Sequence, residues 1–481
     1  MNRKMVFNTA GRIAQTTALL LLVPAVVALV YREYESLFAF LITASCSFVA
    51  GLIILLITRT KNRVIYAKEG FAITALAWVI MALVGAVPFT LSGEIPSYVD
   101  AVFETVSGFT TTGASILTDV EAMSHSMLFW RSFSHWIGGM GVLVFVMAII
   151  PNITDRSIHI MRAEMPGPVI GKLVPRVKDT AKILYLIYIV LTFVEFVLLC
   201  VGGMSVFDSM LHSFGTAGTG GFGIKADGLA GYSPYCQWVI AIFMLIFGIN
   251  FNLYYLLLIK RFKTVIRSTE LWSYIGIVVV STALITANIM PIYDNISNAF
   301  RDSAFQVASI VTTTGYSTVD FNLWPAFSKG IIFILMFSGG CAGSTAGGLK
   351  VARSVMLIKN IRREFKKLLH PRSVSAVHFE GKPVEDATIN GVSTYFSIYI
   401  VCILAVFLCI SFEPLGFETN FTAAVSCFNN VGPGLAGVGP ASSYAAYGDF
   451  SKILLSFAML LGRLEIFPLL IALSPAVWIK K

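Results

Sequence analysis

This 481-residue chain contains few charged residues, and their low fraction excludes an ordinary soluble domain. Only 13% of the residues are charged, about half the usual fraction, whereas 56% are hydrophobic. The apolar residues form blocks of about 20, the length that a helix needs to cross the hydrocarbon core of a bilayer. The clearest blocks span residues 13–31, 37–58, 71–91, 183–203, 238–259, 272–290 and 392–412. The composition predicts a multi-pass membrane protein in contact with the lipid bilayer.

The sequence also lacks the residue patterns of enzymes and of metal proteins. The seven cysteines include no CxxC pair, and the six histidines show no spacing typical of metal ligands. Neither paired acids nor a Ser/His/Asp constellation occurs, so we expect no enzyme. The segment GSTAGGLK differs from a phosphate-binding loop, because Leu349 separates the last glycine from the lysine. We therefore expect no bound nucleotide in this chain.

The net charge of +9 follows membrane topology rather than nucleic-acid binding. Most lysines and arginines lie in alternate connections between apolar blocks, and most acids lie in the others. The basic connections span residues 3–12, 59–68, 156–182, 260–267, 350–382 and 480–481. Because basic connections stay in the cytoplasm, the pattern predicts that both termini are cytoplasmic. The acidic outer connections would concentrate cations, and nucleic acid is not an expected partner.

One short segment recurs four times at a period of roughly 100 residues. The copies cover residues 100–115 (DAVFETVSGFTTTGAS), 208–223 (DSMLHSFGTAGTGGFG), 302–317 (DSAFQVASIVTTTGYS) and 419–434 (TNFTAAVSCFNNVGPG). They align on one shared glycine, which is Gly113, Gly221, Gly315 and Gly432 in turn. A flexible loop explains any single Thr/Gly-rich stretch, but four copies on one acidic face favour a structural repeat.

Each copy lies between two apolar blocks, which indicates a helix, a short pore helix, a turn and a second helix. The sequence thus predicts an all-α integral membrane protein with four helix–pore-loop–helix repeats around one pseudo-fourfold pore. An N-terminal two-helix hairpin precedes the repeats. The expected units are the hairpin at 1–60 and repeats at 61–160, 161–262, 263–385 (with a broken inner helix) and 386–481. Asp100, Asp208 and Asp302 are expected to cap the pore helices.

The four turns have the chemistry of a filter for a dehydrated monovalent cation. Backbone carbonyls replace a hydration shell, glycine permits the backbone angles, and pore-helix dipoles favour positive charge. No carboxylate falls within the turns, which disfavours calcium or magnesium. The long TVGYG signature is absent, so we expect a short filter with moderate selectivity. The predicted filter residues are Thr110, Thr111, Thr112, Gly113, Gly218, Thr219, Gly220, Gly221, Thr312, Thr313, Thr314, Gly315, Asn429, Asn430, Val431 and Gly432.

The second helix of the third repeat loses its helix-forming residues in mid-membrane. Most residues from 338 to 348 are small, which predicts a non-helical loop beneath the filter that acts as a gate. Close helix packing through small residues is the alternative. Arg463 is assigned to the same gate, either pairing with Glu465 or capping carbonyls of the loop, and its charge would oppose cations. The predicted gate comprises Ser338, Gly339, Gly340, Cys341, Ala342, Gly343, Ser344, Thr345, Ala346, Gly347, Gly348 and Arg463.

With the fourfold repeat, the shared glycine and the segment SGGCAGSTAGGLK, the chain resembles the Trk/Ktr/HKT superfamily of potassium transporters. The likeness covers essentially the whole chain, and the added hairpin favours the Trk branch. It implies potassium uptake across the bacterial inner membrane, a homodimer and a cytoplasmic TrkA-like regulatory subunit with nucleotide-binding domains. It also assigns the shared glycines to the family filter and residues 338–348 to its gate loop. The second filter departs from the family pattern at Gly218, Gly220 and Gly223, which bears on its selectivity.

A symporter of the same fold, moving potassium with protons or sodium, is the alternative function. It would require a titrating carboxylate in the ion path. Glu104, beside the first filter, is the candidate for that role. Glu195 is a further acid within an apolar block, for which functional and structural roles are both open.

Overall fold

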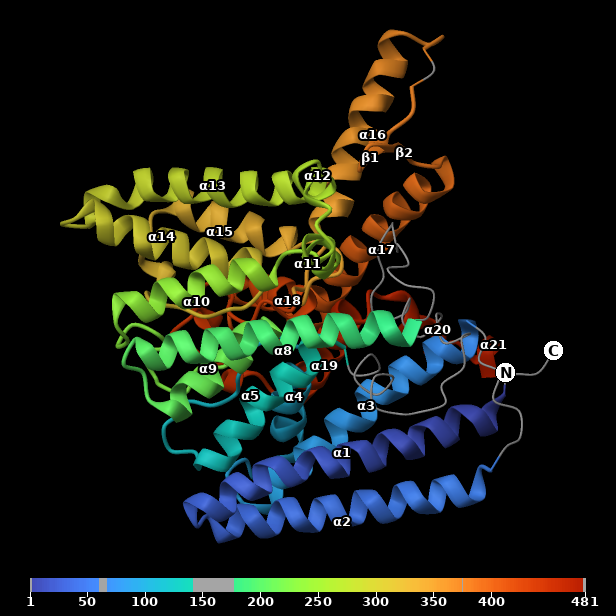
Figure 1. Cartoon of the computed structure of the whole chain (residues 1–481), viewed down its shortest axis with the longest axis vertical. Coiled ribbons are helices and arrows are strands. Elements are labelled where there is room, and N and C mark those ends of the chain that lie inside the picture. The colour runs from blue at the N-terminus through green and yellow to red at the C-terminus, as the bar shows by residue number, and fades with distance from the viewer. Residues whose placement is uncertain (1, 60–66, 142–176, 374, 479–481) are drawn as a thin grey trace.

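The protein is built almost entirely of helices that run side by side through one body (Figure 1). The computed structural model describes residues 2–59, 67–141, 177–373 and 375–478. The expected unit boundaries near residues 61 and 160 fall outside those ranges. In the described part, the one sheet pairs β1 (His378–Phe379) with β2 (Lys382–Pro383) in antiparallel register. The predicted all-helical membrane architecture is confirmed.

Six helices in the described ranges are long and apolar enough to cross a membrane. They are α1 (Arg3–Tyr31), α2 (Tyr34–Ile57), α3 (Ala67–Leu91), α8 (Val177–Val201), α13 (Thr269–Ile289) and α17 (Asp386–Ile410). The predicted hairpin, α1 and α2, lies at one edge of the body (Figure 1). Large apolar side chains such as Val30 and Leu408 remain exposed on these helices. That exposure suits contact with lipid, where apolar surface carries no cost.

A pore helix follows each of the four outer helices α3, α8, α13 and α17. These pore helices are α4 (Tyr98–Phe109), α9 (Val206–Gly218), α14 (Ile296–Val311) and α18 (Phe417–Asn429). All four are too short to span a bilayer, and each ends at one of the predicted filter turns. The four-repeat organisation that the sequence predicted is therefore present.

The predicted aspartate caps of the pore helices are wrong. Ser97 caps α4 by accepting a hydrogen bond from the backbone N–H of Asp100, and Ser205 caps α9 in the same way from Asp208. The hydroxyl of a capping serine accepts from the N–H of the third helical residue, which here is the aspartate. The aspartate side chain can therefore bind residues of other segments. Asp100 pairs with Lys452 at 2.6 Å. Asp302 lies farther into α14, whose cap is Asn295.

The inner helices that follow the pore loops are also short. They are α5 (His125–Gly139), α10 (Pro234–Phe247), α15 (Ala326–Ser338) and α19 (Asp449–Arg463), each 13–15 residues long. Only the third was expected to break. The chain also bends by 89° between α10 and α11 (Phe251–Leu258), and by 120° between α19 and α20 (Phe467–Leu473). Hydropathy does not distinguish a bent apolar segment from a straight one, so the sequence prediction missed both bends.

The remaining elements lie at the two ends of the bundle. They are α12 (Phe262–Ile266), α16 (Val351–Leu369), α21 (Pro475–Trp478), and the 3-10 turns η2 (Met290–Ile292), η3 (Phe321–Leu323), η4 (Ala436–Val438) and η5 (Tyr444–Ala446). Helix α16 projects away from the bundle (Figure 1). The two ends of the described chain meet, because Arg3 Nε donates to the carbonyl of Trp478 at 3.1 Å.

Candidate functional site

The four shared glycines form a closed ring of contacts around one axis. A Cβ on any of them would collide with the carbonyl oxygen just before the equivalent glycine of the next repeat. The distances would be 2.1 Å from Gly113 to Gly220 O, 1.8 Å from Gly221 to Thr314 O, 2.3 Å from Gly315 to Val431 O, and 2.6 Å from Gly432 to Thr112 O. No side chain fits at such distances, so glycine is required at each position. The fourth contact returns to the first repeat, and the pore loops therefore encircle a single pore.

The backbone takes the same path in all four pore loops. Each shared glycine has a left-handed φ between 75° and 98°, and so does the residue two positions earlier, at 54° to 57°. Those earlier residues are Thr111, Thr219, Thr313 and Asn430. Left-handed φ is costly for residues other than glycine, so the surrounding structure must impose it. The weak fourth copy thus shares the conformation of the other three.

The first and third pore loops are nearly identical in side-chain structure. The hydroxyls of Thr110 and Thr112 lie 2.8 Å apart, as do those of Thr312 and Thr314. Thr110 also donates to the carbonyl of Val106 at 2.7 Å, which fastens the loop to the end of α4. Both pore helices end at these threonines, so their negative C-terminal ends face the ring and favour a cation.

His135 explains why the second pore loop contains glycine at two positions where the first and third loops contain threonine. A Cβ on Gly220 would lie 2.2 Å from Cγ of the His135 ring, and one on Gly218 would lie 2.3 Å from the His135 carbonyl oxygen. The ring is fully buried, with Nδ1 2.7 Å from the Gly108 carbonyl and Nε2 3.3 Å from the Phe222 N–H. These distances assign Nδ1 as the donor and Nε2 as the acceptor. His135 therefore occupies the volume that threonine side chains would need.

Two asparagines fasten the fourth pore loop to its neighbours. Asn430 Nδ2 donates to Thr112 Oγ1 of the first loop and to the Met459 carbonyl, both at 2.9 Å. Asn429 Oδ1 accepts from the Tyr399 hydroxyl at 2.6 Å. An amide side chain supplies two donors and one acceptor group, more than a threonine can offer. The departure from threonine in this repeat thus has a structural consequence, a direct bond between the first and fourth loops.

Glu104 forms a buried ion pair behind the first pore loop. Its Oε1 lies 2.7 Å from Arg131 Nη2, and both side chains are almost fully buried. The carboxylate also accepts from Ser115 and from the Ile116 N–H, whereas Arg131 donates to the Gly223 carbonyl at 3.2 Å. The carboxylate of Glu104 is thus committed to contacts within the protein. The pair joins the exit of the first loop to that of the second.

The predicted intramembrane loop, residues 338–348, lies directly beneath the pore loops. Gly347 N–H donates to Thr313 Oγ1 at 2.6 Å, and Gly348 N–H donates to the Asn429 carbonyl at 3.0 Å. A Cβ on Gly347 would lie 2.5 Å from that same carbonyl oxygen. The predicted interruption of the helix is present, since α15 ends at Ser338 and α16 begins at Val351.

Lateral contacts hold this loop against the break between α10 and α11. Cys341 N–H donates to the Gly248 carbonyl at 2.9 Å, and Phe251 N–H donates to the Gly343 carbonyl at 3.1 Å. Thr345 Oγ1 donates to the Phe247 carbonyl at 3.2 Å. Backbone groups left without helical partners at the α10–α11 break thus form hydrogen bonds with backbone groups at the α15–α16 break. Buried backbone groups need such partners.

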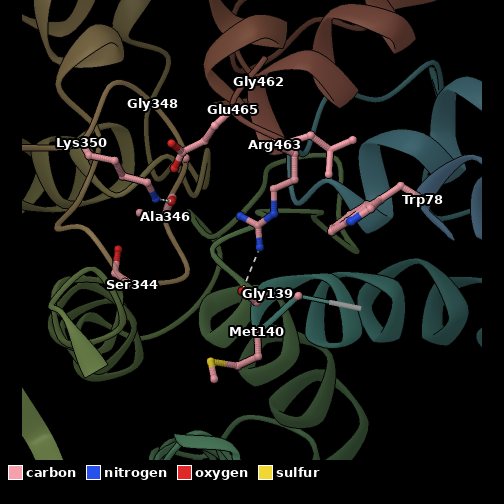
Figure 2. A pocket seen from close by; sticks show the side chains of 14 residues that line it. Trp78, Gly139, Met140, Ser344, Ala346, Gly348, Lys350, Gly462, Arg463 and Glu465 are labelled. Atoms are coloured by element: carbon pink, nitrogen blue, oxygen red, sulfur yellow. Dashed lines mark hydrogen bonds between the residues drawn. The ribbon is translucent and has the colours of Figure 1, made fainter. Parts of the chain in front are cut away.

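Arg463 reaches from the end of α19 into a cavity of about 50 Å³ below the pore loops (Figure 2). Its guanidinium donates to the Thr345 carbonyl at 2.7 Å and to those of Gly138 and Gly139 at 2.5 and 2.8 Å. It therefore bridges the intramembrane loop and the negative end of α5. These contacts are those expected for the carbonyl-capping alternative, and Glu465 forms an ion pair with Arg353.

Lys350 also lines the cavity, a position that the sequence analysis did not predict. It is 9% exposed, and its ammonium group donates to the Ala346 carbonyl of the intramembrane loop. Figure 2 shows Lys350 and Arg463 pointing into the same space from opposite sides, with Glu465 above them. The space below the ring is therefore occupied by two fixed cations.

Glu195 differs from Glu104 in its surroundings. Its side chain is fully buried in α8 and faces Thr216 of the second pore helix. Neither carboxylate oxygen has hydrogen-bonding geometry with any described partner. An ionised carboxylate in such a place would be very costly.

This architecture defines a class of membrane protein, in which four loops of one chain surround a pore and a broken helix lies beneath them. The TrkH family of cation transport proteins matches residues 36–478. The Trk system potassium uptake protein TrkH of Salmonella typhimurium is 37% identical over 468 residues, covering 95% of each chain. TrkG of Escherichia coli is 33% identical, covering 99% of this chain and 98% of its own. The crystal structure of the potassium transporter TrkH from Vibrio parahaemolyticus matches with a TM-score of 0.90 at 31% identity, covering 100% of both chains.

The chain belongs to the TrkH family of cation transport proteins. It is a membrane transport protein, not an enzyme.

Proposed function

We propose that the chain takes up potassium across the bacterial inner membrane through a channel-like pore, with its termini in the cytoplasm. The observation that carries this proposal is the closed ring of glycine and carbonyl contacts among Gly113, Gly221, Gly315 and Gly432. A ring of backbone carbonyls can replace the hydration shell of a potassium ion. Two relatives named as Trk system potassium uptake proteins support the choice of ion.

The pore loops at 110–113, 218–221, 312–315 and 429–432 form the proposed selectivity filter. Their walls are unequal: two are rich in threonine, one in glycine, and one carries asparagine. We infer a short filter with moderate discrimination against sodium, since only one glycine position is common to all four loops.

The proposed gate is the intramembrane loop, residues 338–348, together with Arg463. The loop abuts Thr313 and Asn429, and the Arg463 charge stands below the ring. A fixed cation in a cavity with little water repels a permeating ion strongly. Conduction would therefore require the loop and Arg463 to move.

Two further features belong to the proposal through the family resemblance, a homodimer and a cytoplasmic TrkA-like regulatory subunit with nucleotide-binding domains. The basic segment at 350–382 would be available to such a subunit. The unit boundaries 1–60, 61–160, 161–262, 263–385 and 386–481, drawn from the sequence repeat, are also part of the proposal.

Proton-coupled symport is the second candidate function, and Glu195 is the observation that favours it. A membrane-buried carboxylate without a described hydrogen-bond partner suits a group that binds a proton. Glu104, the other candidate carboxylate, is engaged in a buried ion pair with Arg131.

Rubidium uptake into sealed vesicles containing the purified chain tests the proposal. We expect uptake above that of empty vesicles, and uptake independent of an imposed proton gradient supports the channel over the symporter. Gly113→Ser should reduce the preference for potassium over sodium, because the new side chain displaces Gly220 O. Vesicles that pass rubidium no faster than empty ones would overturn both functions, and unchanged ion preference in Gly113→Ser would overturn the filter assignment.

A further inference from the structure

The intramembrane loop has an anchor on its cytoplasmic side that the proposed gate does not include. Glu270, at the start of α13, is 5% exposed. Its Oε1 accepts a hydrogen bond from the Ala342 N–H of the loop at 2.6 Å. Hydrogen bonds to a carboxylate are shorter and stronger than those between neutral groups. The loop is thus held from below by a carboxyl group on a different helix.

Glu270 stands where the two ends of the broken segment meet. Its carboxylate also faces the backbone N–H of Ala352, in the first turn of α16, and the side chain of Asn250. Ala352 belongs to the helix by which the chain leaves the loop, and Asn250 caps α11 after the bend. A negative side chain is favourable at the N-terminus of α16. The Glu270 carboxyl group therefore contacts the intramembrane loop, the start of α16 and the cap of α11.

The tip of the β1–β2 hairpin reaches the same place from outside. Glu380 and Gly381 have φ values of 51° and 73°, as expected for the two central residues of a tight hairpin turn. Glu380 Oε1 accepts from Ser268 Oγ and from the Glu270 backbone N–H, both at 3.0 Å. Ser268 is the N-cap of α13. The hairpin tip thus binds the first turn of α13, on the residue whose side chain holds the loop.

The β1–β2 hairpin also packs against α16 and α17. Lys359 of α16 donates to the His378 carbonyl at 2.8 Å. Phe379 packs in one apolar cluster with Ala352 and Met356 of α16 and with Val392 of α17. The hairpin therefore contacts α16 and α17 on one side and the first turn of α13 at its tip, so a displacement of the hairpin would be transmitted to α13.

We propose that Glu270 is a positioning residue that holds the intramembrane loop closed, and that the hairpin at 378–383 acts on the loop through Glu380 and Glu270. This inference rests on the proposed role of the loop as a gate. A cytoplasmic partner that displaces the hairpin would shift the start of α13. Glu270 would then lose its contact with Ala342, and the loop would be freed from below.

Rubidium uptake by the full chain in vesicles, without any partner, gives the first test. We expect Glu270→Ala to raise uptake on the order of tenfold, because it removes the hydrogen bond from Ala342 that stabilises the closed loop. Glu380→Ala should raise uptake less, and the double variant no more than Glu270→Ala alone, since both act on one path. Glu385→Ala, which removes an exposed carboxylate just after the hairpin, is the matched control and should match wild type.

Cysteine reactivity separates release of the loop from general unfolding. Cys341 lies in the loop and Cys427 in the fourth pore helix, and both are fully buried. In Glu270→Ala we expect faster alkylation of Cys341 and unchanged alkylation of Cys427, measured by mass spectrometry. Glu270→Gln keeps an acceptor oxygen and should restore slow alkylation of Cys341.

Three results would overturn the inference: wild-type alkylation of Cys341 in Glu270→Ala, a parallel rise at Cys427, or Glu270→Gln behaving as Glu270→Ala. The alkylation measurement needs no transport. Failure of the proposed function would instead appear as absent rubidium uptake by wild-type protein.

Discussion

The imidazole of His135 and the backbone of Gly220 are in direct contact, so that a Cβ on Gly220 would lie 2.2 Å from the ring. This contact joins the inner helix of the first repeat to the pore loop of the second. The histidine also binds Gly108 at the end of the first pore helix. One buried side chain therefore fixes the relative position of two of the four loops.

Gly220→Ala should destabilise the protein by about 1–3 kcal/mol or more, because the new methyl group overpacks against His135. The measurement is the thermal unfolding midpoint of the purified protein in detergent. Gly223→Ala is the matched control two residues beyond the shared glycine. A Cβ there meets its nearest neighbour at an ordinary 3.5 Å, so its midpoint should stay close to wild type. Equal midpoints for both variants would contradict the role of His135.

Arg463→Gln should raise rubidium uptake on the order of tenfold, because it removes a fixed positive charge from the cavity below the ring. The glutamine can still donate to the Thr345 carbonyl, so loss of the loop contact is limited. Arg463→Lys retains the charge and is the control, with uptake expected near that of wild type. Equal uptake by the two variants would show that charge at this position does not limit conduction.

The ring of glycines was predictable because its requirements are local. A left-handed residue in close contact with backbone admits only glycine, so Gly113, Gly221, Gly315 and Gly432 recur in the sequence at one register. The interruption after Ser338 was predictable for a similar reason, since small residues in mid-membrane remove helix propensity.

Contacts between residues far apart in the chain had no such signal in the sequence. His135 contacts Gly220, and Glu270 binds Ala342 across 72 positions of the chain. The bends after Phe247 and Arg463 occur inside apolar segments. Hydropathy measures the composition of such a segment and carries no information on the direction of the chain. Asp100 and Asp208 lost the capping role because a serine three residues earlier fills it.

Glu195→Gln should leave the thermal unfolding midpoint unchanged or raise it. The amide keeps the shape of the side chain and removes a carboxylate that is fully buried without a described hydrogen-bond partner. Glu104→Gln is the contrasting variant, and it should lower the midpoint because it leaves Arg131 buried without its counter-charge. A larger loss in Glu195→Gln than in Glu104→Gln would mean that Glu195 has a cationic partner. For the symporter, Glu195→Gln should also abolish any dependence of rubidium uptake on a proton gradient.

Glu33, in the connection between α1 and α2, should make the stability of the protein sensitive to acid. Burial by itself raises the pKa of Glu33, but hydrogen bonds from Ser126 and His125 outweigh it and lower the pKa below its ordinary value of 4.5. The carboxylate accepts from the backbone N–H groups of His125 and Ser126 at 2.8 and 2.9 Å, and so caps the start of α5. Because the folded-state pKa is lowered, this contribution is present above about pH 4.5 and is lost as the pH falls through the lower folded-state value.

Unfolding midpoints measured from pH 7 down to pH 4 test this linkage. Glu33→Gln should lower the midpoint by a few degrees at pH 7, because the amide has one acceptor oxygen in place of two and carries no charge at the helix N-terminus. The difference from wild type should begin to shrink below about pH 4.5, because Glu33 then takes up a proton in the unfolded state and the stabilisation by its carboxylate declines. Glu35→Gln, at an exposed neighbouring carboxylate, should show no comparable change with pH. A constant difference between Glu33→Gln and wild type across this range would mean that the cap acts through shape alone.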